Sequence, residues 1–377
     1  MPKTVVYTAE IEHLQILDED GKLDAALAKD VDLTDADVKA LYEAMVINRE
    51  YDHVAFQLQR SGRLGTFPQN KGQEAAALGA ARALRKGHDW IVPYYRENAA
   101  SFWHGLPMHY VYNFWMGDER GNQIPKNVAM SPICVEIGAQ TLHGAGIAWA
   151  FKLQKTDKVV VTFMGEGATS TGDWHEGLNF AAVMKLPAIF SIINNGYAIS
   201  VPCGKQCIAE TFAQKALGYG IPAIRVDGND IFAVYKAHKD AAERARRGEG
   251  PSVIENLTYR LGDHTTADDA RRYRSAEELS EATKKDPIVR TRKYLESKNA
   301  WDDKQQAAIE QRAKVIVQEV MKVSLGMEKP AIDDIFDYTF AQLPDEIVRQ
   351  KQTQKTHSIG QDPEQAGLKQ THEHQQV

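Results

Sequence analysis

Residues 158–195 read KVVVTFMGEGATSTGDWHEGLNFAAVMKLPAIFSIINN, and this stretch sets the fold class. Its segments 158–164 and 188–193 are continuous apolar runs rich in β-branched residues, which is typical of strands buried on both faces of a sheet. A turn of small residues and a helical pattern over 174–184 lie between the two runs. A buried strand, a helix and a second buried strand predict two parallel strands joined by a crossover.

The same alternation continues towards the C-terminus. Strands are expected over 223–226 and 252–259, with a helix over 231–247 between them. The sequence therefore predicts an α/β fold, with a parallel sheet flanked by helices on both faces. Two further helical patterns, over 287–297 and 303–323, predict that the C-terminal part of the domain is helical.

The rest of the chain predicts three regions. Residues 1–33 are mixed and polar, and we interpret them as an N-terminal arm. Residues 34–345 form the α/β domain, which begins with helices over 35–60, where Thr34 stands at the cap position, and 73–84. Residues 346–377 are rich in Gln, His, Lys and Glu with few large apolar residues, so we expect a polar, disordered tail.

Composition excludes several classes of protein. The 377 residues are 43% hydrophobic and 25% charged, as in soluble globular proteins. A net charge of -6 gives no reason to expect a nucleic-acid partner, and no apolar run is long enough to predict a membrane span. The N-terminal residues lack the apolar core of a secretion signal, and the three cysteines are too few for a disulfide-stapled fold. We therefore expect a cytoplasmic protein with reduced thiols.

Polar residues follow both predicted strands of the opening stretch. Gly165-Glu166-Gly167 follows the first strand, and Asn194-Asn195 follows the second. A turn of small residues before a helix presents backbone N–H groups that bind phosphate, and ligands of parallel sheets lie beyond the carboxyl ends of the strands. A carboxylate, a carboxamide and a nearby backbone carbonyl are oxygen ligands suited to a hard divalent ion. Together they predict a site for a metal ion and a diphosphate.

Two other phosphate loops fit less well. A dinucleotide-binding loop needs a third glycine where Ser170 stands, and an acidic residue where Asn194-Asn195 stands. The Gly-Lys-Ser/Thr of a P-loop is absent from the sequence. A nicotinamide-dependent oxidoreductase therefore stays a less favoured alternative, and a non-catalytic scaffold that keeps only the fold is another.

At these residues the sequence resembles the alpha subunit of the decarboxylating component of 2-oxo acid dehydrogenase complexes, the pyruvate and branched-chain dehydrogenase family. The family's motif for thiamine diphosphate (ThDP) is Gly-Asp/Glu-Gly, a spacer and Asn-Asn, which residues 165–195 match. The resemblance extends over about residues 14–343. It includes the segments GRLGTFPQNKGQEAA, VPYYRE, FWHGLP, RGNQIP, VDGNDIFAVY and YRLGDHTTADDARRYR.

The resemblance implies a role for each matching residue. Glu166, the Asn195 side chain and the Tyr197 backbone carbonyl would hold Mg2+. The other residues implied in binding ThDP form the turn, contact its phosphates or support its bent shape; they are Tyr95, Arg96, Ile137, Gly165, Gly167, Ala168, Arg260 and His264. His264 is also the implied catalytic residue, since it matches a loop histidine able to exchange protons near neutral pH.

The resemblance also implies partners. In two-chain members of the family, the glutamate that activates ThDP belongs to a beta subunit, and no residue of this chain matches it. We therefore expect this chain to form a heterotetramer with a beta subunit. The assembled heterotetramer is expected to decarboxylate a small 2-oxo acid and to transfer the acyl group to the lipoyl groups of an acyltransferase core. No nucleic acid or membrane is expected.

Departures from the family pattern bear on substrate and regulation. Glu166 stands where the family usually has Asp, and Glu occurs in branched-chain members. The whole chain is closer to bacterial pyruvate dehydrogenase alpha subunits, so we favour pyruvate and keep a branched-chain 2-oxo acid as the alternative. Ile193 replaces a polar residue of some relatives, and Thr265 replaces the phosphorylated Ser of mitochondrial members.

Overall fold

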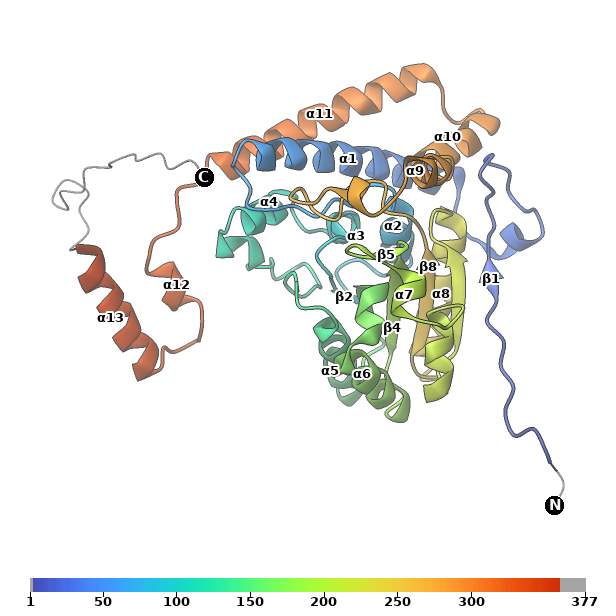
Figure 1. Ribbon diagram of the computed structural model, residues 1–377, viewed down its shortest axis with the longest axis horizontal. Coiled ribbons are helices and arrows are strands. Elements are labelled where there is room, and N and C mark those ends of the chain that lie inside the picture. Colours follow the sequence, from blue (N-terminus) through green and yellow to red (C-terminus); the bar gives the residue numbers. More distant parts are fainter. Residues whose placement is uncertain (1–2, 360–377) are drawn as a thin grey trace, which may run out of the picture. The chain divides into compact units, whose positions relative to one another are not determined.

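The computed structural model describes residues 3–359, and its central element is a six-stranded sheet with all neighbours parallel (Figure 1). The strand order is β1-β7-β8-β4-β3-β2. The strands are β1 (His13–Leu14), β2 (Trp90–Val92), β3 (Val160–Gly165), β4 (Ala188–Asn194), β7 (Ala223–Asp227) and β8 (Ser252–Leu257). The predicted parallel sheet is confirmed, and β3 pairs directly with β4.

Helices cover both faces of this sheet, as expected. Val160 and Met164 of β3 pack with α5 (Ala139–Leu153) and α6 (Gly172–Val183) on one face. Val161 and Phe163 point to the other face, where α2 (Glu74–Arg82) and α8 (Ile231–Arg246) lie. Alternate residues of a strand face opposite sides, so a strand with two covered faces is apolar throughout.

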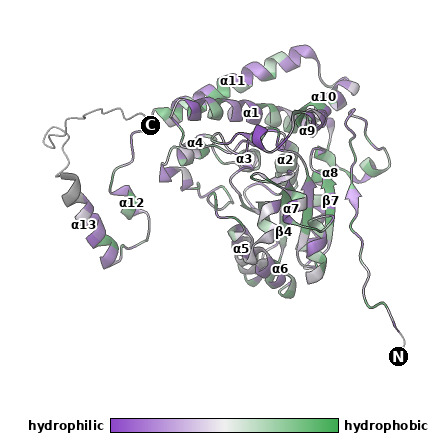
Figure 2. Ribbon diagram, in the orientation of Figure 1, coloured by the Kyte–Doolittle hydropathy of each residue, from purple (hydrophilic) through white to green (hydrophobic). Residues whose placement is uncertain are grey.

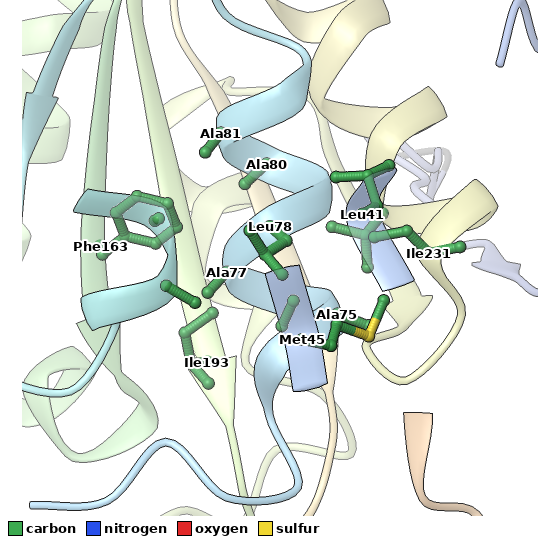
Figure 3. Close-up of a cluster of buried hydrophobic side chains, with 14 of the residues drawn as sticks. Leu41, Met45, Ala75, Ala77, Leu78, Ala80, Ala81, Phe163, Ile193 and Ile231 are labelled. Carbon is green, nitrogen blue, oxygen red and sulfur yellow. The ribbon is translucent and has the colours of Figure 1, made fainter. Parts of the chain in front are cut away.

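An alanine-rich helix brings the second layer close to the sheet. In Figure 3, α2 lies between Phe163 and Ile193 on one side and Leu41 and Met45 on the other. A Cβ atom added to Gly79 of α2 would lie 2.7 Å from Val234 of α8. Small side chains on α2 therefore set the distance between these helices.

Long helices pack on the outside of α2. Helix α1 (Asp35–Arg60) starts with the predicted Thr34 cap, which forms a capping box with Asp37. Helix α10 (Pro287–Ser297) begins and ends as expected, and α11 (Asp303–Leu325) ends two residues later than expected. Helix α11 buries only a narrow stripe, and Figure 2 shows it as largely hydrophilic.

Shorter elements connect this framework. The remaining helices up to residue 326 are α3 (Asn98–His104), α4 (His109–Trp115), α7 (Cys203–Gln206) and α9 (Ala276–Thr283). A two-stranded hairpin, β5 (Tyr197–Ala198) and β6 (Val201–Pro202), follows β4, and 3-10 turns occur at η1 (Leu27–Asp30), η2 (Glu119–Asn122), η3 (Glu166–Ser170), η4 (Ala213–Tyr219) and η5 (Ala270–Arg272). Within residues 3–359, none of the helices is both long and apolar enough to span a bilayer.

The N-terminal arm differs from expectation in its second half. Strand β1 pairs with β7, which places residues 13–14 at the edge of the sheet. The Asp230 carboxylate accepts hydrogen bonds from the backbone N–H groups of Ile16 and Leu17 at 2.6 and 2.7 Å, and both side chains are buried. Part of the predicted arm therefore belongs to the domain, because the open edge of β7 offers unpaired backbone groups.

The chain divides into two compact units, Met1–Gly326 and Met327–Val377. The second contains α12 (Asp334–Asp337) and α13 (Asp345–Ile359), so the first residues of the predicted disordered tail form a helix. Gln, Lys and Glu are good helix formers, and Asp345 and Glu346 in the first turn complement the helix dipole. The predicted disorder of residues 360–377 lies outside the described residues.

Two glycines of α5 give a direct test of how tightly this helix packs on the sheet. A Cβ atom at Gly144 would lie 2.0 Å from Oγ1 of Thr162, whereas one at Gly146 would meet no atom within 4 Å. We expect Gly144→Ala to destabilise the protein by about 1–3 kcal/mol through overpacking, measured by chemical denaturation. Gly146→Ala is the control and should raise stability by up to about 1 kcal/mol, because alanine favours helix. Equal unfolding midpoints for the two variants would contradict this packing.

Candidate active site

The site is built where two neighbouring parallel strands end. Residues 160–165 of β3 pair with 188–193 of β4, so Gly165 lies opposite Ile193. Glu166 and Asn195, which follow the strands, therefore meet at the carboxyl edge of the sheet. The backbone N–H of Asn195 donates to Oε2 of Glu166 at 3.4 Å.

A cavity of about 190 Å³ opens at this edge. Every residue that the sequence predicts as a site residue lines it: Tyr95, Arg96, Ile137, Gly165, Glu166, Gly167, Ala168, Asn195, Tyr197, Arg260 and His264. Tyr94, Ala198 and Ile199 complete the lining. Segments separated by more than a hundred residues in sequence therefore converge on one cavity. The roles of these residues stay predictions.

The Glu166 carboxyl group lies in a place where it has little solvation. The residue is 1% exposed, and burial raises the pKa of its carboxyl group. Its Oε1 atom has no hydrogen-bond partner among the described residues. A buried carboxylate oxygen without a donor is costly in free energy, and a bound cation would offset that cost.

The Asn195 side chain lies between two other groups. Its Nδ2 donates to Oε1 of Gln73 at 3.1 Å, and its Oδ1 accepts from the backbone N–H of Tyr197 at 3.3 Å. Tyr197 begins the β5–β6 hairpin, and its hydroxyl donates to Glu278 at 2.8 Å. The carboxamide oxygen of Asn195 therefore keeps a second lone pair, and one hydrogen of its amino group is used.

Hydrogen bonds from other elements hold the turn after β3. Gln206 of α7 donates through Nε2 to the Glu166 carbonyl at 2.9 Å, and Lys215 donates to the Thr169 carbonyl at 3.0 Å. A Cβ atom at Gly167 would lie 3.1 Å from the Cβ of Ala198, so a larger residue would crowd the hairpin. The sequence thus folds locally into a fixed turn of small residues at the cavity.

Two buried arginines supply positive charge on the other side of the cavity. Arg96 donates to the carbonyls of Gln69 at 2.7 Å and His264 at 2.9 Å. Arg260 donates to the Ile199 carbonyl and to the Tyr273 hydroxyl, both at 2.8 Å. With neutral His264 and one carboxylate, the lining carries a net positive charge that suits an anion.

His264 is held between these arginines in a single protonation state. Its Nδ1 lies 3.1 Å from Nη2 of Arg96 and 3.1 Å from Nη1 of Arg260. Guanidinium groups only donate, so Nδ1 accepts and the ring proton lies on Nε2. Burial, then Arg96 and Arg260, lower the pKa of His264 to about 3. In the chain alone, burial and the two flanking cations therefore favour the neutral ring near neutral pH, and proton exchange by His264 stays a prediction.

Some residues at the site were missed by sequence reasoning. Gln73 is buried and contacts Asn195, although only the surrounding GRLGTFPQNKGQEAA segment was recognised. Gln206 contacts the turn from a short helix that carries no motif. The two cysteines near it, Cys203 and Cys207, are free thiols, and among residues 3–359 no group of three or more His, Cys, Asp or Glu residues is arranged to hold a metal.

Comparison with known proteins identifies the family to which this chain belongs. The profile of the family described as "Dehydrogenase E1 component" matches residues 42–332. The chain belongs to the dehydrogenase E1 component family. It is 44% identical, over 92% of its own length and 94% of theirs, to proteins named "Pyruvate dehydrogenase E1 component subunit alpha" from Staphylococcus aureus (strain COL) and Staphylococcus epidermidis. The resemblance noted in the sequence and the predicted enzyme class, an oxidoreductase, are confirmed for this E1 component chain.

The environment of His264 predicts an unusual titration. In the E1 component chain the ring should stay neutral well below pH 6.5, and the pKa should rise towards that ordinary value in Arg260→Met, which removes one flanking cation. NMR of 13C-labelled histidine would measure this, with the signal assigned through His264→Asn. A wild-type signal that titrates near pH 6.5 would contradict the geometry.

The same pKa has a consequence for stability. Because the pKa is lower in the folded state, His264 costs no stability above about pH 6.5, and its destabilising effect grows as the pH falls from 6.5 towards 3.

Proposed function

We propose that this chain is the alpha subunit of a ThDP-dependent pyruvate dehydrogenase E1 component. The proposal is supported by the relatives, which are named pyruvate dehydrogenase E1 component subunit alpha, and by one cavity whose lining includes the eleven predicted residues. The observation that carries the proposal is the buried carboxyl group of Glu166, whose Oε1 has no hydrogen-bond partner in the described part of the chain, in a cavity that Arg96 and Arg260 also line. These groups offer a cation site and an anion site side by side, as a metal diphosphate requires.

The residues present fit Mg2+ and ThDP. Glu166, the side-chain oxygen of Asn195 and the backbone carbonyl of Tyr197 would hold Mg2+, and its usual ligands are oxygen atoms of these kinds. The backbone of the turn, together with Arg96 and Arg260, would bind the diphosphate. The remaining lining residues would hold the organic part of the cofactor; they are Tyr95, Ile137 and His264.

When bound, ThDP supplies the carbon nucleophile and the electron sink for decarboxylation of a 2-oxo acid. This chain would hold and orient the cofactor. His264 would act as a neutral hydrogen-bond donor through Nε2, since two guanidinium groups occupy Nδ1. It would thereby orient the reacting acyl group during transfer to a lipoyl group.

The cavity lining also supports a partner chain. Among the described residues that line it, Glu166 is the only carboxylate, and its proposed task is to bind the metal. The carboxylate that activates the cofactor would therefore come from a beta subunit, and Ile137, 46% exposed, marks a side of the cavity open to another chain. We propose a heterotetramer that serves a lipoyl-bearing acyltransferase core and, from the composition, a cytoplasmic location.

The substrate assignment is tested by reconstitution. The chain is co-expressed with a beta subunit of a pyruvate dehydrogenase E1 component, and turnover of pyruvate and of 3-methyl-2-oxobutanoate is compared in the presence of Mg2+ and ThDP. We expect a kcat/KM at least about 10-fold higher for pyruvate, which corresponds to about 1.4 kcal/mol of transition-state binding. Preference for the branched substrate would favour the alternative that Glu166 suggests, and tight NAD binding without ThDP binding would overturn the enzyme class.

Glu166→Gln tests the metal site. Glutamine has nearly the same shape as glutamate but cannot ionise, so the variant relieves the cost of burying a carboxyl group. The ligand-free protein should therefore unfold at the same temperature as wild type or higher. The rise in unfolding temperature caused by Mg2+ and ThDP should be lost, because a ligand stabilises only the state that binds it.

Glu243→Gln, an exposed change on α8, is the control and should keep the full ligand-induced rise. A rise as large in Glu166→Gln as in wild type would refute the assignment of Glu166.

A further inference from the structure

Gln73 is a buried glutamine that occupies the N-cap position of α2 and reaches the cavity edge from a segment far from both motif strands. Its Oε1 accepts from Nδ2 of Asn195 at 3.1 Å. Its own Nε2 has no hydrogen-bond partner among the described residues. A buried amide that leaves one group unsatisfied needs a reason, and the single bond that it makes is to Asn195.

The backbone around Gln73 is fixed on several sides. Gly72 has φ +91°, and a Cβ atom there would lie 2.6 Å from the Tyr259 carbonyl, so the turn is closely packed against the chain that follows β8. Thr258 donates through its hydroxyl to the Gly72 carbonyl at 3.0 Å. The Glu74 carboxylate accepts from the Gly72 N–H at 2.9 Å and from Nε of Arg49 at 2.5 Å. Gln73 is therefore presented to Asn195 from a rigid support.

The orientation of the Asn195 carboxamide decides what it can bind. With Nδ2 bonded to Gln73 and one lone pair of Oδ1 bonded to the Tyr197 N–H, the second lone pair of Oδ1 remains available, and such an oxygen suits a divalent ion. If the carboxamide turned over, its oxygen would face Oε1 of Gln73 and its amino group would face the Tyr197 N–H, so both hydrogen bonds would be lost. That arrangement would remove the carboxamide oxygen from metal binding.

The geometry points to Gln73 as a positioning residue of the metal site: its side-chain carbonyl binds the amino group of the Asn195 carboxamide and thereby keeps the carboxamide oxygen available. This inference rests on the proposed metal–diphosphate function of the cavity. Partners of this kind, one bond removed from the metal, set the orientation of the ligands that touch it.

The test measures metal binding rather than turnover. Affinity for Mn2+ is determined by electron paramagnetic resonance on the complete alpha/beta assembly with ThDP present. Gln73→Met keeps the length of the side chain and removes the acceptor. It should weaken Mn2+ binding by about 10-fold or more, as loss of such partners does in other metal sites. ThDP binding should weaken at limiting Mg2+ and recover at high Mg2+.

Two further variants keep the test decisive. Gln306→Met removes a glutamine that accepts hydrogen bonds from Tyr42 and Trp301 far from the cavity, and it should lower stability while Mn2+ affinity stays within two-fold, on the order of experimental error. Gln73→Glu retains an acceptor opposite Asn195 and should keep affinity closer to wild type than Gln73→Met.

Mn2+ affinity of Gln73→Met equal to that of wild type would overturn the inference, as would equal losses in Gln73→Met and Gln73→Glu. If the wild-type assembly itself does not bind Mn2+ together with ThDP, the proposed function fails. If wild type binds both and Gln73→Met binds them equally well, only the role of Gln73 fails.

Discussion

The parallel pairing of β3 with β4 is the constraint on which the rest of the structure depends. Because Gly165 lies opposite Ile193, the residues that follow the two strands reach the same edge of the sheet, although Glu166 and Asn195 are 29 positions apart. A shift of the pairing by one residue would turn alternate side chains to the opposite face and move both layers of helices. The apolar residues that hold this register on each face therefore also hold the distance between Glu166 and Asn195.

The same edge concentrates charges that oppose folding. Glu166 is buried with an oxygen that has no donor within residues 3–359, and burial together with Arg96 lowers the pKa of Arg260. Burial, and then the two arginines that face it, lower the pKa of His264 and favour the neutral ring. In the chain alone these groups cost stability, and the surrounding core compensates for the cost. A bound metal ion would give the Glu166 carboxylate a partner, and a bound diphosphate would pair with the two arginines. The groups that cost stability in the chain alone are therefore the groups that would bind the ligands.

Periodicity in the sequence predicted the framework well, because the two-sided sheet and the long amphipathic helices are repeated local patterns. The limits of α1 and α10 agree with the expectation, since Thr34 and Pro287 are local signals for a helix start. Contacts that depend on distant residues were not predictable. The pairing of β1 with β7 rests on a two-residue strand and on Asp230, which is more than two hundred positions away. Helix α13 combines a polar composition with helix-forming residues, and composition alone favoured disorder.

The site shows the same division between local signal and distant contact. Motif spacing identified Glu166 and Asn195, and resemblance brought in Arg96, Arg260 and His264, all of which line the cavity. Neither motif spacing nor resemblance indicated the protonation or the orientation of those side chains. The pKa of His264 depends on two arginines from separate segments, and the availability of the Asn195 oxygen depends on the orientation of an amide. Residue type can therefore be read along the chain, but protonation and orientation are properties of the assembled neighbourhood, and it is these that determine what the site can bind.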